Sequence, residues 1–395
     1  MATLNKIDQY NKGNMFPENY NETYIATQYI CKDTLKIPNN IIDLLKNKIE
    51  EKNLYFGDDS VLQEIITGII KGNIILQGPP GTGKTTLAKI ICEVFNTSYT
   101  EITAISDWST YDTIGGIQPV IDSNNNETFD GKNGLIVDAI LKSCNTILEN
   151  EKYSGNFTAD WLIIDELNRC EIDKVFGELF TVFGNDDISQ IKKINLPFYK
   201  NENKKEIYIP NKFRIIGTMN DVDKDFVFNI SQGLSRRFSF ISIYPPTEDH
   251  FIDEIKNAKI VASKKAIRKI NNDSFILTDI INSSTFKNNE NIIIDLLKRI
   301  RYKKDDSFLG LPLGTAQIID LYESIFISIY VSDYKNSNSK EVMLKSIIDS
   351  QIANKIVPLL NGYDYTKLSD FINNFKSTSQ FSFLIKTQVN LENLL

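Results

Sequence analysis

A glycine-rich segment with one lysine and three threonines lies near the middle of the first half of the 395-residue chain. It consists of Gly78, Pro79, Pro80, Gly81, Thr82, Gly83, Lys84, Thr85 and Thr86. Glycines at these spacings let successive backbone N–H groups turn towards phosphate oxygens. We expect Lys84 to contact the β- and γ-phosphates and the Thr85 hydroxyl to bind Mg²⁺. The segment predicts a nucleoside-triphosphate site.

Two adjacent carboxylates, Asp165 and Glu166, end the apolar run WLII. A carboxylate at the end of a buried strand is costly unless it meets a cation, and Mg²⁺ beside Thr85 is such a cation. We predict that Asp165 is the second metal ligand. Glu166 points to the opposite side and polarises the attacking water. The alternative is an acidic pair that caps the following helix.

Three further polar side chains complete the predicted site. Asn220 ends the apolar run IIGTM, where its amide can orient water or touch the γ-phosphate. The alternative is an ordinary turn with Asp221. Arg236 or Arg237 could be supplied to the γ-phosphate of a neighbouring subunit. The other arginine would then be a charged helix C-terminus that the helix dipole stabilises.

Short β-prone runs alternate with helical patterns before residue 245. The expected strands are 73–77, 98–105, 161–165, 214–219 and 238–243. The expected helices are 41–51, 60–71, 84–95, 135–149, 172–183 and 226–233. Residues 129–134 indicate a turn, and residues 191–213 indicate a short hairpin or a long loop. Alternating strands and helices predict a parallel sheet with helices on both faces.

The pattern changes at Pro245–Pro246 and becomes helical. The expected helices there are 248–262, 291–302, 315–332, 339–356 and 366–375. We therefore expect a short N-terminal extension at 1–55 and an α/β core at 56–245. A smaller α-helical lid domain and C-terminal helices follow at 246–395. The predicted fold class is α/β, a P-loop parallel sheet flanked by helices and followed by this lid.

Composition excludes several classes of function. With His250 as the single histidine, and four scattered cysteines without a CxxC pair, neither histidine catalysis nor a structural zinc site is expected. The polar start and the absence of a ~20-residue apolar run predict a cytoplasmic protein without membrane association. A net charge of −7 argues against nonspecific nucleic-acid binding. The basic run 298–304 leaves weak or indirect DNA contact open.

Taken together, the motifs resemble those of the AAA+ ATPases, and within them the MoxR/McrB-like branch. WLIIDELNRCEID at 161–173 resembles the Walker B stretch of that branch, IIGTMNDVD at 215–223 its sensor-1 strand, and LSRRFSFI at 234–241 its arginine-finger segment. DWSTYDTIGG at 107–116 and FDGKNGLIVDAI at 129–140 are similar to the loop and insert hairpin of McrB-like proteins. The resemblance covers about 60–320.

The resemblance implies a homo-oligomeric ring, usually of six subunits, with nucleotide and Mg²⁺ at each interface. McrB relatives prefer GTP and MoxR relatives use ATP, and on family numbers we expect ATP. Many such lids present a sensor-2 arginine, whereas the matching segment here carries Gln317. Arg299 and Arg301 lie nearby in sequence and could substitute for it.

Three functions agree with the sequence. The first is a McrB-like motor that drives a partner nuclease or another effector in restriction or antiphage defence. The second is a MoxR-type chaperone that remodels or activates a client protein. The third is a nucleotide-gated scaffold with slow hydrolysis, against which the intact Glu166 and arginine pair argue. Since only about 55 residues precede the core, we do not expect this chain to recognise modified bases.

Overall fold

A computed structural model of the chain forms two compact units, each described separately here. It describes residues 27, 30, 34–56, 59–121, 125–153, 155–177, 179–183, 192–220, 232–271, 277–305, 307–332, 334 and 339–395. The first, which we call the α/β unit, contains the described residues up to Ile49 together with Asp59–Gly78 and Lys84–Ile243. The second, which we call the helical unit, contains Glu50–Asp58, Pro79–Gly83 and Tyr244–Leu395.

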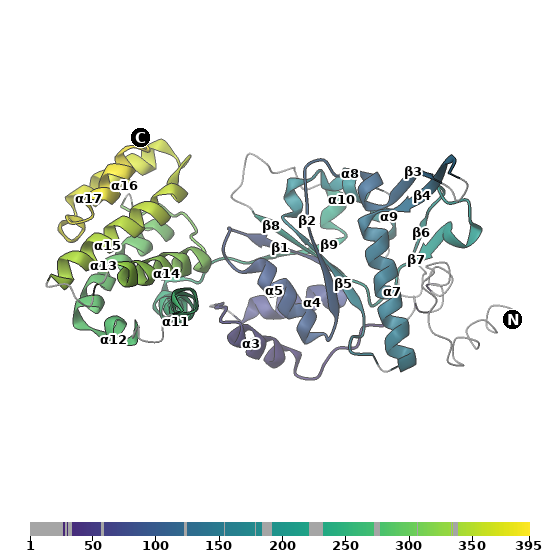
Figure 1. The fold of residues 1–395 in the computed structure, drawn as a ribbon, viewed down its shortest axis with the longest axis horizontal. Helices are drawn as coiled ribbons and strands as arrows, with labels where there is room; N and C mark the ends of the chain where they lie inside the picture. The colour runs from purple at the N-terminus through teal and green to yellow at the C-terminus, as the bar shows by residue number, and fades with distance from the viewer. Residues whose placement is uncertain are drawn as a thin grey trace. The chain divides into compact units, whose positions relative to one another are not determined.

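A five-stranded parallel sheet forms the centre of the α/β unit (Figure 1). In spatial order its strands are β2 (Ser98–Thr103), β5 (Asp160–Asp165), β8 (Ile215–Asn220), β1 (Asn73–Gly78) and β9 (Phe238–Ser242). The inner strands β5, β8 and β1 are buried along almost their whole length, whereas the edge strand β2 alternates in exposure. Continuous apolar runs are typical of parallel strands covered on both faces.

Helices flank this sheet. Their bounds are α3 (Ile41–Glu51), α4 (Ser60–Lys71), α5 (Lys84–Val94), α6 (Thr110–Thr113), α7 (Leu135–Tyr153), α8 (Ile172–Phe176), α9 (Leu179–Phe183) and α10 (Gln232–Ser235). Helix α5 packs against β1, β2, β5 and β8, α4 against β1 and β9, and α7 against β5. In α4 the buried residues Leu62, Ile65, Ile66 and Ile69 recur at helical spacing and form one apolar face.

Two small antiparallel hairpins complete the α/β unit. One pairs β3 (Gly115–Ile121) with β4 (Glu127–Asn133), and the other pairs β6 (Lys193–Asn195) with β7 (Glu206–Tyr208). The Tyr199 hydroxyl donates to Asn133 Oδ1 at 2.8 Å and links the two regions. The prediction of a turn at 129–134 is wrong, because most of these residues lie in β4. Pairing with β3 satisfies their backbone groups and overrides their turn-like composition.

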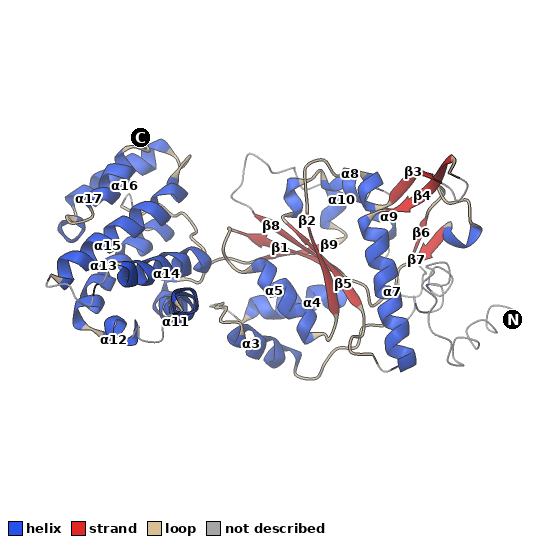
Figure 2. Cartoon of the chain, viewed as in Figure 1, coloured by secondary structure: helices blue, strands red, loops and turns tan. Residues whose placement is uncertain are grey.

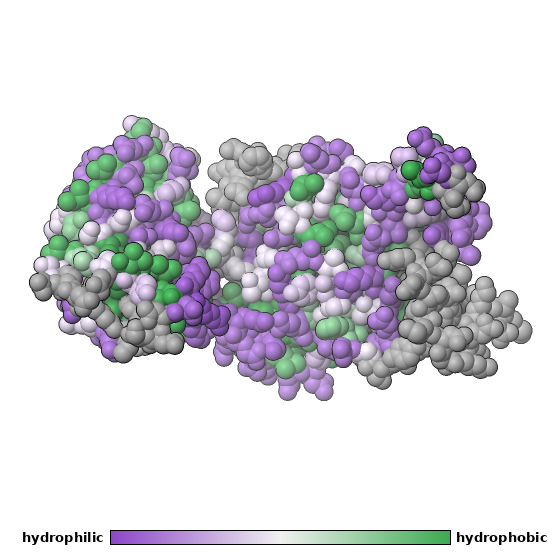
Figure 3. Space-filling view, in the orientation of Figure 1, coloured by the Kyte–Doolittle hydropathy of each residue, from purple (hydrophilic) through white to green (hydrophobic). Residues whose placement is uncertain are grey.

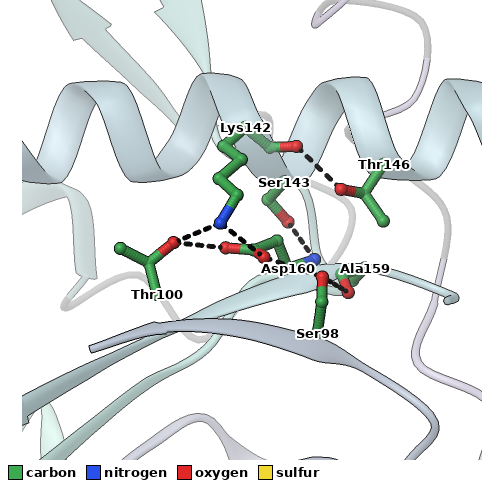
Figure 4. Close-up of polar contacts among 7 residues, drawn as sticks. All are labelled: Ser98, Thr100, Lys142, Ser143, Thr146, Ala159 and Asp160. Carbon is green, nitrogen blue, oxygen red and sulfur yellow. Dashed lines mark hydrogen bonds and ion pairs between the residues drawn. The ribbon is translucent and has the colours of Figure 1, made fainter.

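A buried carboxylate joins the N-terminal ends of β2 and β5 to α7 (Figure 4). Asp160 is fully buried and accepts hydrogen bonds from Ser98 Oγ at 2.7 Å and Thr100 Oγ1 at 2.9 Å. The Lys142 ammonium lies 3.2 Å from the same carboxylate. Because the charge is both paired and hydrogen-bonded, the group stabilises this end of the sheet.

All regular elements described between Tyr244 and Leu395 are helices (Figure 2). The α-helices are α11 (Phe251–Ile270), α12 (Leu277–Asn282), α13 (Ser284–Arg301), α14 (Thr315–Val331), α15 (Lys340–Lys355), α16 (Tyr365–Ser377) and α17 (Ile385–Glu392). Their apolar faces form one buried core around Phe286, Tyr322 and Phe371. Glu254 and Arg301 form a buried ion pair within it, and Thr315 Oγ1 donates to Glu254 at 2.6 Å.

Most of the elements expected from the sequence are present, with a few differences. The helix expected at 172–183 is interrupted at Gly177, whose φ of 40° breaks it into α8 and α9. Helices α12 and α17 were not predicted from the sequence. Most of the helix expected at 226–233 lies outside the described residues.

Hydrophilic residues cover much of the face drawn in Figure 3, with smaller hydrophobic patches between them. Among the described residues, no helix combines the length and the apolar character that crossing a bilayer would require.

Candidate functional site

The predicted phosphate loop joins β1 to α5, the strand–loop–helix order that such a loop requires. Gly78, Gly81 and Gly83 have φ values of 150°, 79° and 87°, a region that side-chain-bearing residues rarely adopt. A Cβ on Gly78 would also lie 2.2 Å from the Ile243 carbonyl oxygen. The Lys84 side chain is only 6% exposed, and its ammonium donates to the Gly78 carbonyl at 2.9 Å. The loop therefore has the backbone of a phosphate cradle, with a buried cation at its end.

Residues Pro79–Gly83 of this loop pack within the helical unit. The Ala316 amide donates to Gly81 O at 2.9 Å, and Gln317 Nε2 donates to Pro80 O at 3.1 Å. Gln317, which stands where a sensor-2 arginine was expected, thus lies on the loop itself. The two arginines considered as substitutes are engaged elsewhere, since Arg301 pairs with Glu254 and Arg299 with Asp295.

The predicted metal ligands lie side by side. Thr85 Oγ1, at the start of α5, donates to Asp165 Oδ1 at 2.7 Å. Thr218 of the neighbouring strand β8 donates to the same carboxylate oxygen. A hydroxyl and a carboxylate next to a phosphate cradle fit Mg²⁺, which keeps several water ligands and takes few from protein. Within the described part of the chain, no cluster of three or more His, Cys, Asp or Glu residues forms a fuller metal cage.

Glu166 follows directly and has a backbone rarely adopted by residues other than glycine, with φ 53° and ψ 43°. Its amide donates to Thr218 Oγ1 at 3.0 Å, which helps to hold this conformation. The side chain is 26% exposed and forms an ion pair with Arg169 at 2.7 Å between Oε2 and Nε. A strained residue held by its surroundings is characteristic of functional positions.

The strand order places Asn220 beside the phosphate loop. Asn220 is the partner of Gly78 in the β1–β8 register, so it stands next to the first glycine of the cradle. Its backbone is fixed from both sides, because Asn168 Nδ2 donates to Asn220 O at 3.0 Å and Asn220 N donates to Asn168 Oδ1 at 3.3 Å. These bonds use only backbone atoms of Asn220, and none of them occupies its side-chain amide.

The two candidate arginines differ in their surroundings. Arg237 is half-buried, donates to Phe180 O at 2.5 Å and Gly233 O at 2.7 Å, and stacks over the Phe180 ring. Arg236 is exposed and has no hydrogen bond or ion pair with any described residue. Both stand before the N-terminal end of β9, whereas Asp165 and Asn220 stand at the carboxyl ends of their strands. Within the α/β unit, the arginines therefore do not lie at the strand ends that carry Asp165 and Asn220.

Two residues of this site were not predicted from the sequence, and one predicted residue is exposed. Thr218 links Asp165 to the Glu166 amide, and Asn168 fixes Asn220. Asn168 was noted only as part of a motif, and the strand order was needed to find Thr218. Thr86, which belongs to the predicted loop, is exposed.

Buried thiols in the same unit take no part in the site. Burial raises the pKa of Cys92 to about 12 and the pKa of Cys170 to about 11. Both thiols therefore stay protonated at neutral pH and behave as small apolar side chains.

Comparison with known proteins agrees with this geometry. Residues 73–238 match the model of the AAA domain of the dynein-related subfamily. The chain is 31% identical over 199 residues to the type IV methyl-directed restriction enzyme EcoKMcrB subunit of Escherichia coli K12. The aligned segment covers 49% of this chain and 40% of that protein. It is 25% identical over 203 residues to the chaperone MoxR1 of Mycobacterium tuberculosis, across 51% of this chain and 44% of that protein.

The chain thus spans less than half the length of either relative. A solved structure of a Thermotoga maritima RuvB mutant is 15% identical, covers 89% of this chain and 91% of its own, and has a TM-score of 0.38. A TM-score this low supports no conclusion about the fold beyond the strand order and helices described above. The matched segment contains the phosphate loop, Asp165, Glu166, Asn220 and the arginine pair. Residues 73–238 therefore form an AAA domain of the dynein-related subfamily, in the MoxR/McrB-like branch.

Proposed function

We propose that this chain is a nucleoside-triphosphate hydrolase. The observation that carries the proposal is the contact of Thr85 with Asp165 at 2.7 Å, beside a buried Lys84 and a strained Glu166. We further propose that residues 56–245 are the nucleotide-binding core and residues 246–395 the lid.

Each residue has a role that follows from its position. The backbone N–H groups of Gly81, Thr82 and Gly83 and the Lys84 ammonium hold the phosphates. Thr85 and Asp165 would hold Mg²⁺, which would supply positive charge to the phosphate oxygens. Glu166 accepts a proton from the attacking water. For this, its carboxylate must leave the ion pair with Arg169, and Asn220 orients the same water through its amide.

The site is completed by a neighbouring copy of the chain in a ring. The exposed Arg236 supports this arrangement, because it is available to an outside phosphate and stands at the strand ends opposite to Asp165. A head-to-tail contact that closes by rotation brings such opposite faces together. Arg237 instead anchors its own segment to the Phe180 and Gly233 carbonyls.

The output of the ring is proposed from the relatives. The similarity to the EcoKMcrB subunit favours a McrB-like motor that drives a partner effector such as a nuclease in antiphage defence. The second candidate is a MoxR-type chaperone acting on a client protein, which the similarity to MoxR1 supports. We propose ATP as the nucleotide, with GTP as the alternative that the McrB relationship raises.

Phosphate release with ATP and with GTP, measured together with mass in solution under each nucleotide, tests this proposal. We expect Mg²⁺-dependent release and a nucleotide-driven increase in mass to a ring. A preference for GTP would favour the McrB-type motor, and a preference for ATP would move weight to the MoxR-type remodeller. Absence of hydrolysis with both nucleotides under ring-forming conditions would leave only the nucleotide-gated scaffold.

A further inference from the structure

A pocket lies in the α/β unit, at the opposite strand ends from Asp165 and Asn220. Its volume is about 540 Å³, and its lining includes the residues at which β1 and β9 begin and Arg214, which directly precedes β8. The Thr85–Asp165 pair and Asn220 stand instead at the carboxyl ends of the strands. A six-residue strand such as β8 separates its two ends by roughly 17 Å. The pocket is therefore distinct from the proposed nucleotide site.

The pocket wall is strongly biased in charge. Among the described residues that line it, five are cationic and none is Asp or Glu. The cations are Lys71, Lys192, Arg214, Arg236 and Arg237. A concave surface with charges of one sign raises the local concentration of oppositely charged ligands. The wall thus selects for an anion.

Arg214 makes this a constructed site rather than a chance grouping of surface cations. The side chain is 9% exposed, and burial lowers its pKa to about 10, so it stays charged at neutral pH. Nε donates to Ile69 O at 2.6 Å, Nη1 to Asn211 O at 2.7 Å and Phe213 O at 2.8 Å, and Nη2 to Ile70 O at 3.4 Å.

All four acceptors of Arg214 are neutral carbonyls, and no described carboxylate forms an ion pair with it. A guanidinium has five N–H donors, so one donor on Nη2 is left over. A buried charge without a counter-charge is costly, and an anion in the pocket would supply the missing partner.

Two further cations are available to such an anion. Lys71, the last residue of α4, is exposed, and like Arg236 it has no ion pair with any described residue. Arg237 is already held by the Phe180 and Gly233 carbonyls and contributes charge rather than a free donor.

The rest of the wall is apolar and aromatic. Phe183, Phe213 and Phe238 contribute to it, together with aliphatic side chains. The volume lies in the range of pockets that hold small organic ligands. We propose that this pocket binds an organic anion, a carboxylate or phosphate carried on an aromatic or apolar body.

Binding of phenyl phosphate and of benzoate to the Lys84→Ala variant tests the proposal, because that variant removes the phosphate loop as a competing anion site. Calorimetry should show saturable binding of both probes, with much weaker binding of phenol and of inorganic phosphate. Each lacks one half of the proposed ligand. This readout does not depend on hydrolysis, so the proposed function can fail without affecting it.

Lys71→Ala and Arg236→Ala, each added to Lys84→Ala, locate the site without disturbing the buried Arg214. We expect each to weaken phenyl phosphate binding about tenfold, the equivalent of one charge-assisted hydrogen bond of ~1.4 kcal/mol. Lys174→Ala on α8, an exposed lysine outside the pocket lining, is the matched control and should bind as tightly as the parent.

Absence of saturable binding at millimolar concentration, equal binding of inorganic phosphate, or unchanged binding in both pocket variants would each overturn the proposal. Mass in solution separates two sources of the natural anion. A free ligand leaves the mass unchanged when the probe binds, whereas a carboxylate of a second copy is displaced and the mass falls.

Discussion

The two ends of one sheet differ in chemistry. At the carboxyl ends of the strands, Asp165 and its hydroxyl partners Thr85 and Thr218 bond to one another through side chains. At the N-terminal ends of β8, β1 and β9, Arg214 is held by backbone carbonyls and lines a pocket whose described lining contains no carboxylate. The first end can ligate a cation, whereas at the second end no described carboxylate forms an ion pair with Arg214.

The difference has a topological cause. In a parallel sheet all carboxyl ends lie at one edge, so residues that follow different strands converge there. Residues that precede the strands converge at the other edge in the same way. A chain of this fold therefore has two places where side chains distant in sequence can form a site. Here the carboxyl end combines the Asp165 carboxylate with the Lys84 ammonium, whereas the described lining of the other end carries only cationic charges.

The largest effect is expected from a substitution that removes nucleotide binding at the carboxyl ends of the strands and leaves the other strand ends unchanged. Lys84→Ala removes the buried ammonium of the phosphate loop, so nucleotide binding should fall below detection by calorimetry. Lys89→Ala on the same helix removes only a partly exposed pair with Glu101 and should bind nucleotide normally. Unchanged affinity in Lys84→Ala would refute the assignment of the loop.

The next largest effect distinguishes the roles of Arg236 and Arg237, which lie at the N-terminal end of β9. Arg236→Ala should reduce turnover of the assembled protein by about 10³–10⁵ without loss of stability, as expected for an arginine supplied to another subunit. Arg237→Ala should instead lower the free energy of unfolding by about 1–3 kcal/mol, because it leaves the Phe180 and Gly233 carbonyls without their donor.

Mixing provides the control for action between subunits. Arg236→Ala subunits mixed with Lys84→Ala subunits should regain part of the activity, since an intact arginine can then meet an intact phosphate loop. Phosphate release that stays at the level of the separate variants at every ratio would argue for action within one subunit.

Glu166→Gln should give a smaller effect on turnover, about 10²–10⁴, while nucleotide binding persists. Removal of the base leaves the phosphate loop and the metal ligands in place. Glu171→Gln, which alters an exposed carboxylate five residues later, should hydrolyse at the parental rate. Parental turnover in Glu166→Gln would remove its role as the base and favour a slow nucleotide-gated scaffold.

The smallest effect is expected for Asp160, a buried carboxylate at the opposite end of β5 from Asp165, and it concerns the free energy of unfolding. Asp160→Asn at the N-terminal ends of β2 and β5 weakens the pairing with Lys142 and two hydroxyls, and should cost about 1–3 kcal/mol in the free energy of unfolding. Nucleotide affinity should not change. A loss of affinity equal to that of Lys84→Ala would mean that the two ends of the sheet are coupled.

Local sequence determined much of this molecule. The continuous apolar runs of β1, β5 and β8 indicated their burial, and the glycine spacing of the phosphate loop indicated its backbone, since φ values near 80° at Gly81 and Gly83 favour glycine. Asp165 was found because an acidic residue at the end of a buried run needs a partner. These features depend on residues that are close in sequence.

Tertiary structure decided the rest, because it depends on which strands are neighbours. Thr218 contacts Asp165 because β8 lies beside β5. The strand order β2-β5-β8-β1-β9 cannot be predicted from the sequence of any single strand. Arg236 and Arg237 are adjacent and identical in type, and the tertiary contacts of Arg237 with Phe180 and Gly233 distinguish them. The anion pocket joins ends of α4, β8 and β9 that are far apart in sequence, so only the folded chain could bring its cations together.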